Sequence, residues 1–153
     1  MPTARQESEL EFIVSLSTSS RKMQTAFDSL LRQKGLTLAR ARAMLHIARN
    51  PGVGQSELAK FLAIESPTLV RLLDGLEKQG LIRRSTIEGD RRAKQLTLTE
   101  LAQGDVRQIE DLTKVVGSFM LRGVEADELA IAVRVLDRVF ENIETAMGGH
   151  AAS

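Results

Sequence analysis

The side chains with the most evident chemistry in this sequence are clustered cations. Within residues 83–94, five basic residues stand against two acidic ones, which gives a local charge of +3. The five are Arg83, Arg84, Arg91, Arg92 and Lys94. Residues 32–49 add five cations and no acid, although the whole chain carries only +1. A polyanion could bind these runs if the fold gathers them on one face, whereas scattered over the surface they are ordinary solvated charges.

Other reactive residue types are scarce. The chain has no cysteine, and its two histidines, His46 and His150, lie far apart in the sequence. This composition excludes a thiolate nucleophile, a disulfide and a cysteine-based metal site, and it offers no paired-histidine metal site. It also contains no nucleophile with a neighbouring base and no glycine-rich phosphate loop. We therefore expect no enzyme activity, no metal and no cofactor; turnover of a small molecule would be the observation that favours an enzyme instead.

The length and hydropathy are those of one domain without a membrane span. A chain of 153 residues can bury a single core. Its longest apolar run, residues 129–133, has five residues, and the N-terminus lacks the apolar stretch of a secretory signal. We expect a soluble, cytoplasmic protein.

Two helices are predicted in the first third of the chain. Apolar residues at three-and-four spacing over 8–33 predict a long amphipathic helix, with Gly35 as its stop. Thr37 is a suitable cap for a second helix over 38–49, which ends at Asn50-Pro51-Gly52. The buried stripe of this second helix is expected to be Leu38, Ala41, Leu45 and Ala48.

Two shorter helices joined by a tight connection come next. The first, about 55–62, follows Gly54, with Glu57 placed for a capping-box-like start. The second, about 67–79, has Ser66 as its N-cap and Pro67 at the first helical position, where a missing N–H costs nothing. The expected apolar faces are Leu58, Phe61 and Leu62 in the first and Leu69, Leu72, Leu73 and Leu76 in the second. The pair has the length and spacing of a helix-turn-helix.

After Gly80 the periodicity changes from helical to alternating. Residues 81–85 and 94–99 predict the two strands of a hairpin, and the segment between them carries basic residues and a Gly89-Asp90 turn at its tip. Thr99 then caps a helix over about 100–121, and a last helix covers about 126–147. The fold class is mainly α with a small β-hairpin.

The terminal helices are apolar on more than one face. A second face is added by Val115, Val116, Met120, Ile131, Val135 and Val139. The core of a domain this small covers one face, so a symmetric second copy of the chain is the simplest cover for the other. The alternative is that these residues fill the core of a monomer.

Four segments, in this order and at this spacing, resemble the winged-helix core of MarR-type transcriptional regulators. They are QSELA at 55–59, SPTLVRLLDGLE at 66–77, GLIRR at 80–84 and GDRRAKQLTLT at 89–99. The resemblance implies a winged helix-turn-helix lobe at 37–101 and a dimerisation region formed by 1–36 and 102–153, within one structural domain. It implies a sequence-specific DNA-binding regulator of transcription, usually a homodimeric repressor on a near-palindromic operator.

On double-stranded DNA, the starts of the two short helices would meet the duplex. A helix N-terminus offers unpaired N–H groups and partial positive charge, which makes Gln55, Ser56 and Ser66 candidate phosphate contacts. The second helix would enter the major groove with its non-buried residues, which are Pro67, Thr68, Val70 and Arg71. Arg71 could bind a guanine edge or a phosphate, and Thr68 and Val70 could meet a thymine methyl.

At two positions of this helix the sequence departs from the family. Relatives often carry a polar residue where Val70 stands and a long basic residue in place of Gly75. At Val70 this implies that a different base is read, or that the base is read only by shape. At Gly75 it implies the loss of a contact to the DNA backbone.

The hairpin carries the family's wing motif, Asp-x-Arg, in which the arginine enters the minor groove and the aspartate holds its guanidinium. The motif falls on Asp90 and Arg92, with Arg91 and Lys94 along the phosphates. Because alternate strand residues face opposite sides, at most one of Arg83 and Arg84 faces DNA, and we favour Arg84. The alternatives are a solvated turn, or a winged helix that binds only protein and lacks salt-sensitive DNA affinity.

Regulators of this type usually release DNA when a small aromatic acid binds between the long helices and the winged lobe. The absence of cysteine argues against oxidant sensing, and two histidines argue against zinc, so a small organic effector remains. Arg42 and His46 share one helix face, with Met23 and Phe27 as apolar walls, a set that suits a phenolate or carboxylate. The alternative is that His46 packs between helices and Arg42 is a solvated charge.

Overall fold

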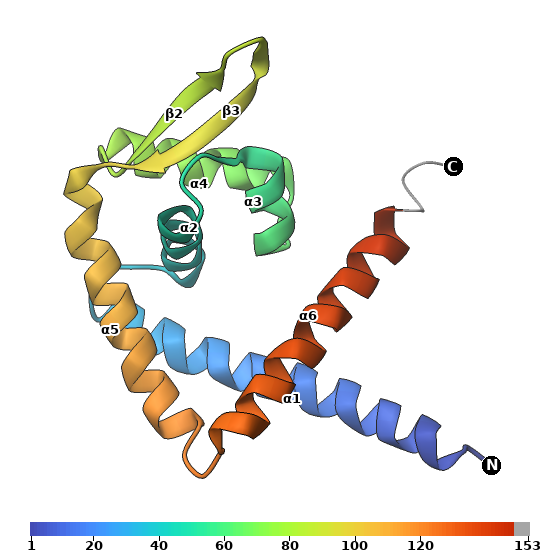
Figure 1. Ribbon diagram of the computed structural model, residues 1–153. Helices are drawn as coiled ribbons and strands as arrows, with labels where there is room; N and C mark the ends of the chain where they lie inside the picture. The colour runs from blue at the N-terminus through green and yellow to red at the C-terminus, as the bar shows by residue number, and fades with distance from the viewer. Residues whose placement is uncertain (149–153) are drawn as a thin grey trace. The chain divides into compact units, whose positions relative to one another are not determined.

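The computed structural model describes residues 1–148, apart from the side chains at positions 91 and 92. The elements are, in chain order, α1 (Ala4–Arg32), α2 (Leu38–Arg49), β1 (Val53–Gly54), α3 (Gln55–Leu62), α4 (Ser66–Lys78), β2 (Ile82–Ile87), β3 (Asp90–Leu98), η1 (Glu100–Ala102), α5 (Gln103–Met120) and α6 (Ala126–Gly148) (Figure 1). The predicted fold class, mainly α with a β-hairpin wing, is confirmed. The chain divides into two compact units, Met1–Val116 and the segment from Gly117 onward.

Side-chain caps set the starts of the first two helices. Thr3 and Gln6 form a capping box, which lets α1 begin four residues before the predicted start. The Thr37 hydroxyl accepts the backbone N–H of Arg40 at 3.3 Å, so α2 begins and ends where the sequence predicts.

The two helices that follow begin without side-chain caps. The N-cap of α4 is Glu65, and Ser66 is already its first helical residue, so the prediction of a Ser66 cap is wrong. The capping box expected at the start of α3 is also wrong, because the N-cap is Gly54, which has no side chain to accept an N–H. Between α3 and α4 the chain turns through Ala63 in the left-handed region, at φ 54°.

The hairpin is longer than predicted and belongs to a three-stranded antiparallel sheet in the order β1-β3-β2. Strand β1 was missed because two residues, Val53 and Gly54, cannot show an alternating pattern. The tip is only Glu88-Gly89, with Gly89 at φ 92°, so Asp90 lies in β3 opposite Ile87 rather than in the turn. The register shifts once, between Thr86 and Ile87.

The first unit holds the hydrophobic core. Helix α2 lies against α1, α3, α4 and β3, so it buries a wider face than the expected stripe. Its fully buried residues are Ala41, Ala43, Met44 and Ile47, while Leu38, Leu45 and Ala48 are partly buried at the edge. Leu69, Leu73 and Leu76 of α4 are buried as predicted. Phe61 is a correction: it is 39% exposed rather than part of the core.

The second unit has a different character, because none of the described residues of α6 is buried. Its exposed apolar residues include Leu129, Ile131, Val133, Val135, Leu136, Phe140, Ile143 and Met147. Among residues 1–148, no helix combines the length and the hydropathy needed to cross a membrane.

Candidate nucleic-acid interface

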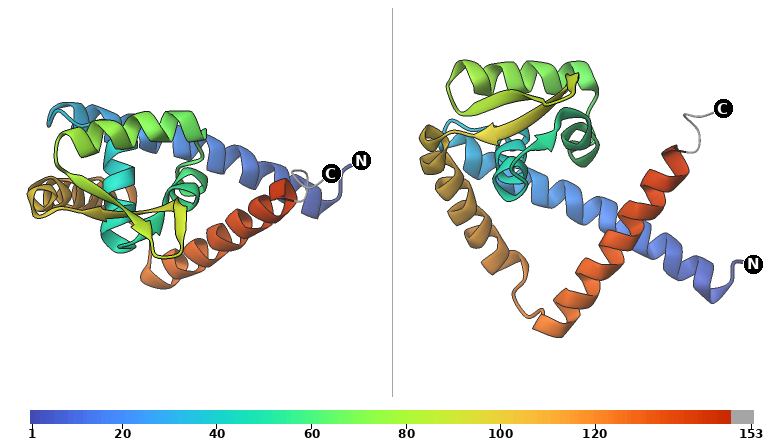
Figure 2. Two further views of the ribbon diagram at one scale, coloured as in Figure 1. Left: turned by 90° about the horizontal axis from the view of Figure 1, so that it is seen from above. Right: turned by 45° about the horizontal axis from the view of Figure 1, so that its top comes forward.

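The starts of α3 and α4 and the outer half of the hairpin share one hollow. The hairpin runs alongside α4, with its tip toward the helix start (Figures 1 and 2). Between them lies a hollow of about 320 Å³. Five residues predicted to contact DNA line it: Gln55, Ser56, Ser66, Val70 and Lys94. These positions, distant in the sequence, are thus gathered on one face.

The exposed side of α4 begins beside this hollow. Pro67, Thr68, Val70 and Arg71 are all exposed, whereas Leu69 between them is buried. Neither α3 nor α4 has a side-chain cap on its described N-terminal turn, so the N–H groups there remain free of a capping side chain. Such N–H groups and the helix dipole attract anions. The first turns of both helices can therefore face a polyanion.

The wing tip carries the predicted minor-groove residues. Asp90 is exposed, as is Lys94, which pairs with Thr86 across the hairpin. The side chains of Arg91 and Arg92 lie outside the described part of the chain, so their contacts stay predictions.

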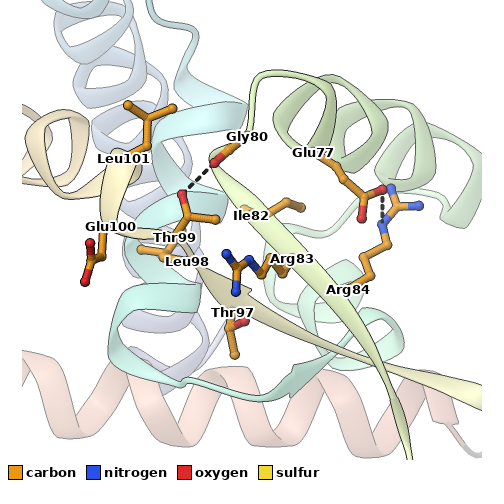
Figure 3. Close-up of a pocket in the computed structure, with 10 residues that line it drawn as sticks. All are labelled: Glu77, Gly80, Ile82, Arg83, Arg84, Thr97, Leu98, Thr99, Glu100 and Leu101. Atoms are coloured by element: carbon orange, nitrogen blue, oxygen red, sulfur yellow. Dashed lines mark hydrogen bonds and ion pairs between the residues drawn. The ribbon is translucent and has the colours of Figure 1, made fainter.

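The Arg84 side chain lies against α4 instead of projecting freely. Its Nη2 is 2.6 Å from Asp74 Oδ1, and the side chain is 17% exposed. Its Nε is 3.8 Å from Glu77 Oε2 (Figure 3). Nη2 also lies 3.5 Å from the Val70 carbonyl oxygen. Sequence reasoning missed this arrangement, although Asp74 and Glu77 are spaced to share one face of a helix.

The neighbouring Arg83 is the exposed arginine of the pair. It stands opposite Thr97 across the hairpin and lines an open hollow of about 960 Å³ at the base of the wing (Figure 3). In this hollow the Thr99 hydroxyl donates to the Gly80 carbonyl at 2.5 Å, which ties the end of β3 to the end of α4.

A separate cavity of about 280 Å³ lies between α1, α2 and α5 in the first unit. Three of the four residues predicted for an effector line it, namely Met23, Phe27 and Arg42. Most other lining residues are apolar, and among the described lining residues Arg42 alone is charged. The cavity therefore combines apolar walls with one cation.

His46 does not line this cavity and packs instead between α2 and α3. Its ring stacks on Phe61 with centroids 3.9 Å apart, and the Arg42 guanidinium carbon lies 5.7 Å from the same ring centroid. Burial lowers the pKa of His46 below its ordinary value, while the Glu57 carboxylate acts in the opposite direction. Its Nε2 has no hydrogen-bond partner among the described residues. His46 thus takes the interhelical packing role that the sequence left open.

Comparison with known proteins identifies the family of this chain. Residues 34–93 match the model of the MarR family. The transcriptional regulator PA3341 is 40% identical over 88% of this chain and 98% of its own, with a TM-score of 0.78.

Two less similar structures share the fold. A MarR family transcriptional regulator from Listeria monocytogenes, solved in complex with a 26mer DNA, is 23% identical over 88% of this chain and 89% of its own, with a TM-score of 0.78. NadR, solved in complex with 4-hydroxyphenylacetate, is 22% identical over 83% of this chain and 90% of its own, with a TM-score of 0.77. From the family match and the PA3341 likeness, the chain belongs to the MarR family and is a DNA-binding transcriptional regulator rather than an enzyme.

Proposed function

We propose that the chain is a homodimeric repressor that binds a near-palindromic operator and leaves it when a small aromatic or acidic organic molecule binds. The observation that carries the DNA-binding part is the shared hollow, in which the first turns of α3 and α4 meet the wing. The DNA complex of the Listeria relative supports the same partner.

In this proposal α4 enters the major groove. The exposed residues of its first turns, Pro67, Thr68, Val70 and Arg71, face the base edges. Gln55, Ser56 and Ser66 hold phosphates at the first turns of α3 and α4, which have no side-chain cap. At the wing, Arg92 enters the minor groove with Asp90 orienting its guanidinium, and Arg91 and Lys94 follow the phosphates.

The dimer is supported by apolar residues that the single chain leaves exposed. They lie in the first half of α1, at Leu10, Phe12, Ile13, Val14 and Leu16, and along α6. Exposed apolar surface on this scale is typical of a protein interface. Two copies would present two α4 helices about one DNA turn apart, which is why the operator should be near-palindromic. A DNA operator as the partner also agrees with a protein of the cytoplasm.

The effector is proposed to occupy the cavity between α1, α2 and α5. Its apolar walls suit an aromatic ring, and the Arg42 guanidinium suits a carboxylate or phenolate. The 4-hydroxyphenylacetate bound to NadR is a molecule of that class. Release requires that the effector bind the DNA-incompetent conformation more tightly than the competent one.

One experiment tests site and effector together. Bound duplexes are selected from a random pool, and the selection is repeated with a panel of aromatic acids. We expect an inverted-repeat site whose affinity falls steeply with salt, and at least one acid that releases it. Enrichment of no duplex at low salt would contradict DNA binding, whereas enrichment unaffected by any acid would contradict only the effector.

A further inference from the structure

Arg84 lies at the boundary between the base of the wing, which is held against α4, and its outer part, which a hollow separates from α4. Its partners Val70, Asp74 and Glu77 lie along one face of α4, so one guanidinium reaches two turns of that helix. Farther toward the tip, the hollow of about 320 Å³ separates α4 from the hairpin. The third strand, β1, pairs with β3 only at Leu96 and Gln95 and gives the tip no support.

The chemistry of this contact suits a fixed geometry. The Arg84 side chain is largely withdrawn from solvent. Its Nη2 donates to the Asp74 carboxylate and to the Val70 carbonyl oxygen, while its Nε lies 3.8 Å from the Glu77 carboxylate without a hydrogen bond. The tip lies roughly 13 Å beyond Arg84 at the usual strand rise, so a small rotation at the contact moves the tip by much more. The contact can thus set where the tip residues stand relative to α4.

We propose that Arg84, Asp74 and Glu77 form a clasp that positions the wing relative to α4, and so fixes the spacing between the major-groove and minor-groove contacts. Arg84 is a positioning residue that acts through the wing, and its guanidinium stays on α4 in the DNA complex. This inference rests on the proposed mode of DNA binding and replaces the expectation that Arg84 itself contacts DNA.

Charge gives the sharpest way to separate a clasp from a direct contact. Arg84→Gln removes a positive charge, whereas Asp74→Asn removes a negative one. If Arg84 binds a phosphate, freeing it from Asp74 should strengthen DNA binding. If the clasp positions the wing, both changes should weaken operator binding, because both break the same contact.

The test measures dissociation constants for the selected operator over a series of salt concentrations. Loss of a clasp worth about 1 kcal/mol lowers the population of the correctly held wing about fivefold, so Arg84→Gln and Asp74→Asn should each weaken binding by about threefold to tenfold. The double variant should be no weaker than Arg84→Gln, because the two changes are coupled. The salt slope should not change, since no phosphate contact is lost. The matched control is Arg83→Gln, which removes the same charge from the exposed neighbour and should affect affinity less.

A repeat of the duplex selection supplies a readout that simple destabilisation does not move. With Asp74→Asn, the bases flanking the α4 contacts should become less restricted while the bases read by α4 stay the same. Thermal unfolding checks each variant, and Arg84→Lys, which keeps the charge and loses the fork, replaces Arg84→Gln if that variant does not fold.

Opposite results overturn the clasp. Asp74→Asn binding as tightly as the unaltered protein or more tightly, or a salt slope that falls by about one with Arg84→Gln, would make Arg84 a direct DNA contact. If the unaltered protein binds no duplex, the proposed function fails and the clasp has nothing to position. The two failures are therefore distinguishable.

Discussion

Helices α4 and α6 have similar apolar patterns, but the apolar side chains of α4 are buried and those of α6 are exposed. In α4, Leu69, Leu73 and Leu76 are buried by the same chain. In α6, Leu136 and Phe140 stand at the same helical spacing but remain 42% and 49% exposed. An amphipathic pattern therefore shows that a face must be covered and does not show whose atoms cover it. Residues of the first unit bury the core side chains of α4, whereas α6 leaves its apolar residues exposed.

The largest effect is expected where the core is complete. Leu73 is fully buried, so Leu73→Ala should lower the free energy of unfolding by about 2–5 kcal/mol through lost transfer energy and a cavity. Chemical denaturation measures this. Val70→Ala is the matched control on the same helix, because Val70 is exposed and its loss should cost little. Similar costs for the two variants would contradict the contrast between the buried and open faces of α4.

The next effect concerns the open face of α6. Leu136→Glu places a charge where we expect a second copy to pack, and it should raise the dimer dissociation constant about tenfold to a hundredfold, from the lost burial of a leucine. Sedimentation over a range of concentrations measures it. The matched control, Asn142→Glu, adds the same charge at a polar position of α6 and should leave the dimer intact. An unaltered protein that sediments as a monomer at micromolar concentration would contradict the proposed dimer.

The wing is also exposed, and we expect its surface to face DNA rather than a second copy of the chain. Arg92→Ala should weaken operator binding by about 1–3 kcal/mol and lower the salt slope by about one. It should leave the sedimentation of the dimer unchanged, unlike Leu136→Glu. Lys94→Ala serves as the control for a plain phosphate contact, because it should weaken all duplexes alike. Equal affinity of Arg92→Ala and the unaltered protein would contradict the wing assignment.

Much of the fold could be predicted because local signals coincide with the final structure. The Thr37 cap and the Asn50-Pro51-Gly52 stop give α2 its observed bounds, and both signals act within a few residues. The errors fall where a local signal competes with a neighbour: Ser66 suits an N-cap, but the helix begins one residue earlier from Glu65. Strand β1 depends on pairing with β3, far along the chain, and leaves no local pattern.

The residues of the candidate site divide in the same way, into features set by local sequence and features set by packing between elements. The sequence indicates which residues of α4 are exposed, because burial follows the helical period. It could not indicate that Arg84 turns toward Asp74, or that His46 stacks on Phe61, because each contact joins two elements whose packing is tertiary. Of the predicted effector residues, the three that line the cavity come from α1 and α2, which pack on each other, and the fourth faces α3 instead.

The smallest effect belongs to the contact between α2 and α3. Burial lowers the pKa of His46 in the folded chain, so near neutral pH and below, the unfolded chain binds the proton more readily. Stability should therefore be complete above the unfolded pKa of about 6.5 and fall as the pH drops below it. Denaturation at about pH 7.5 and pH 5.5 measures the difference, which should shrink in His46→Gln. An undiminished difference in His46→Gln would assign the pH dependence to other groups, and the contact between α2 and α3 would then tolerate protonation of His46.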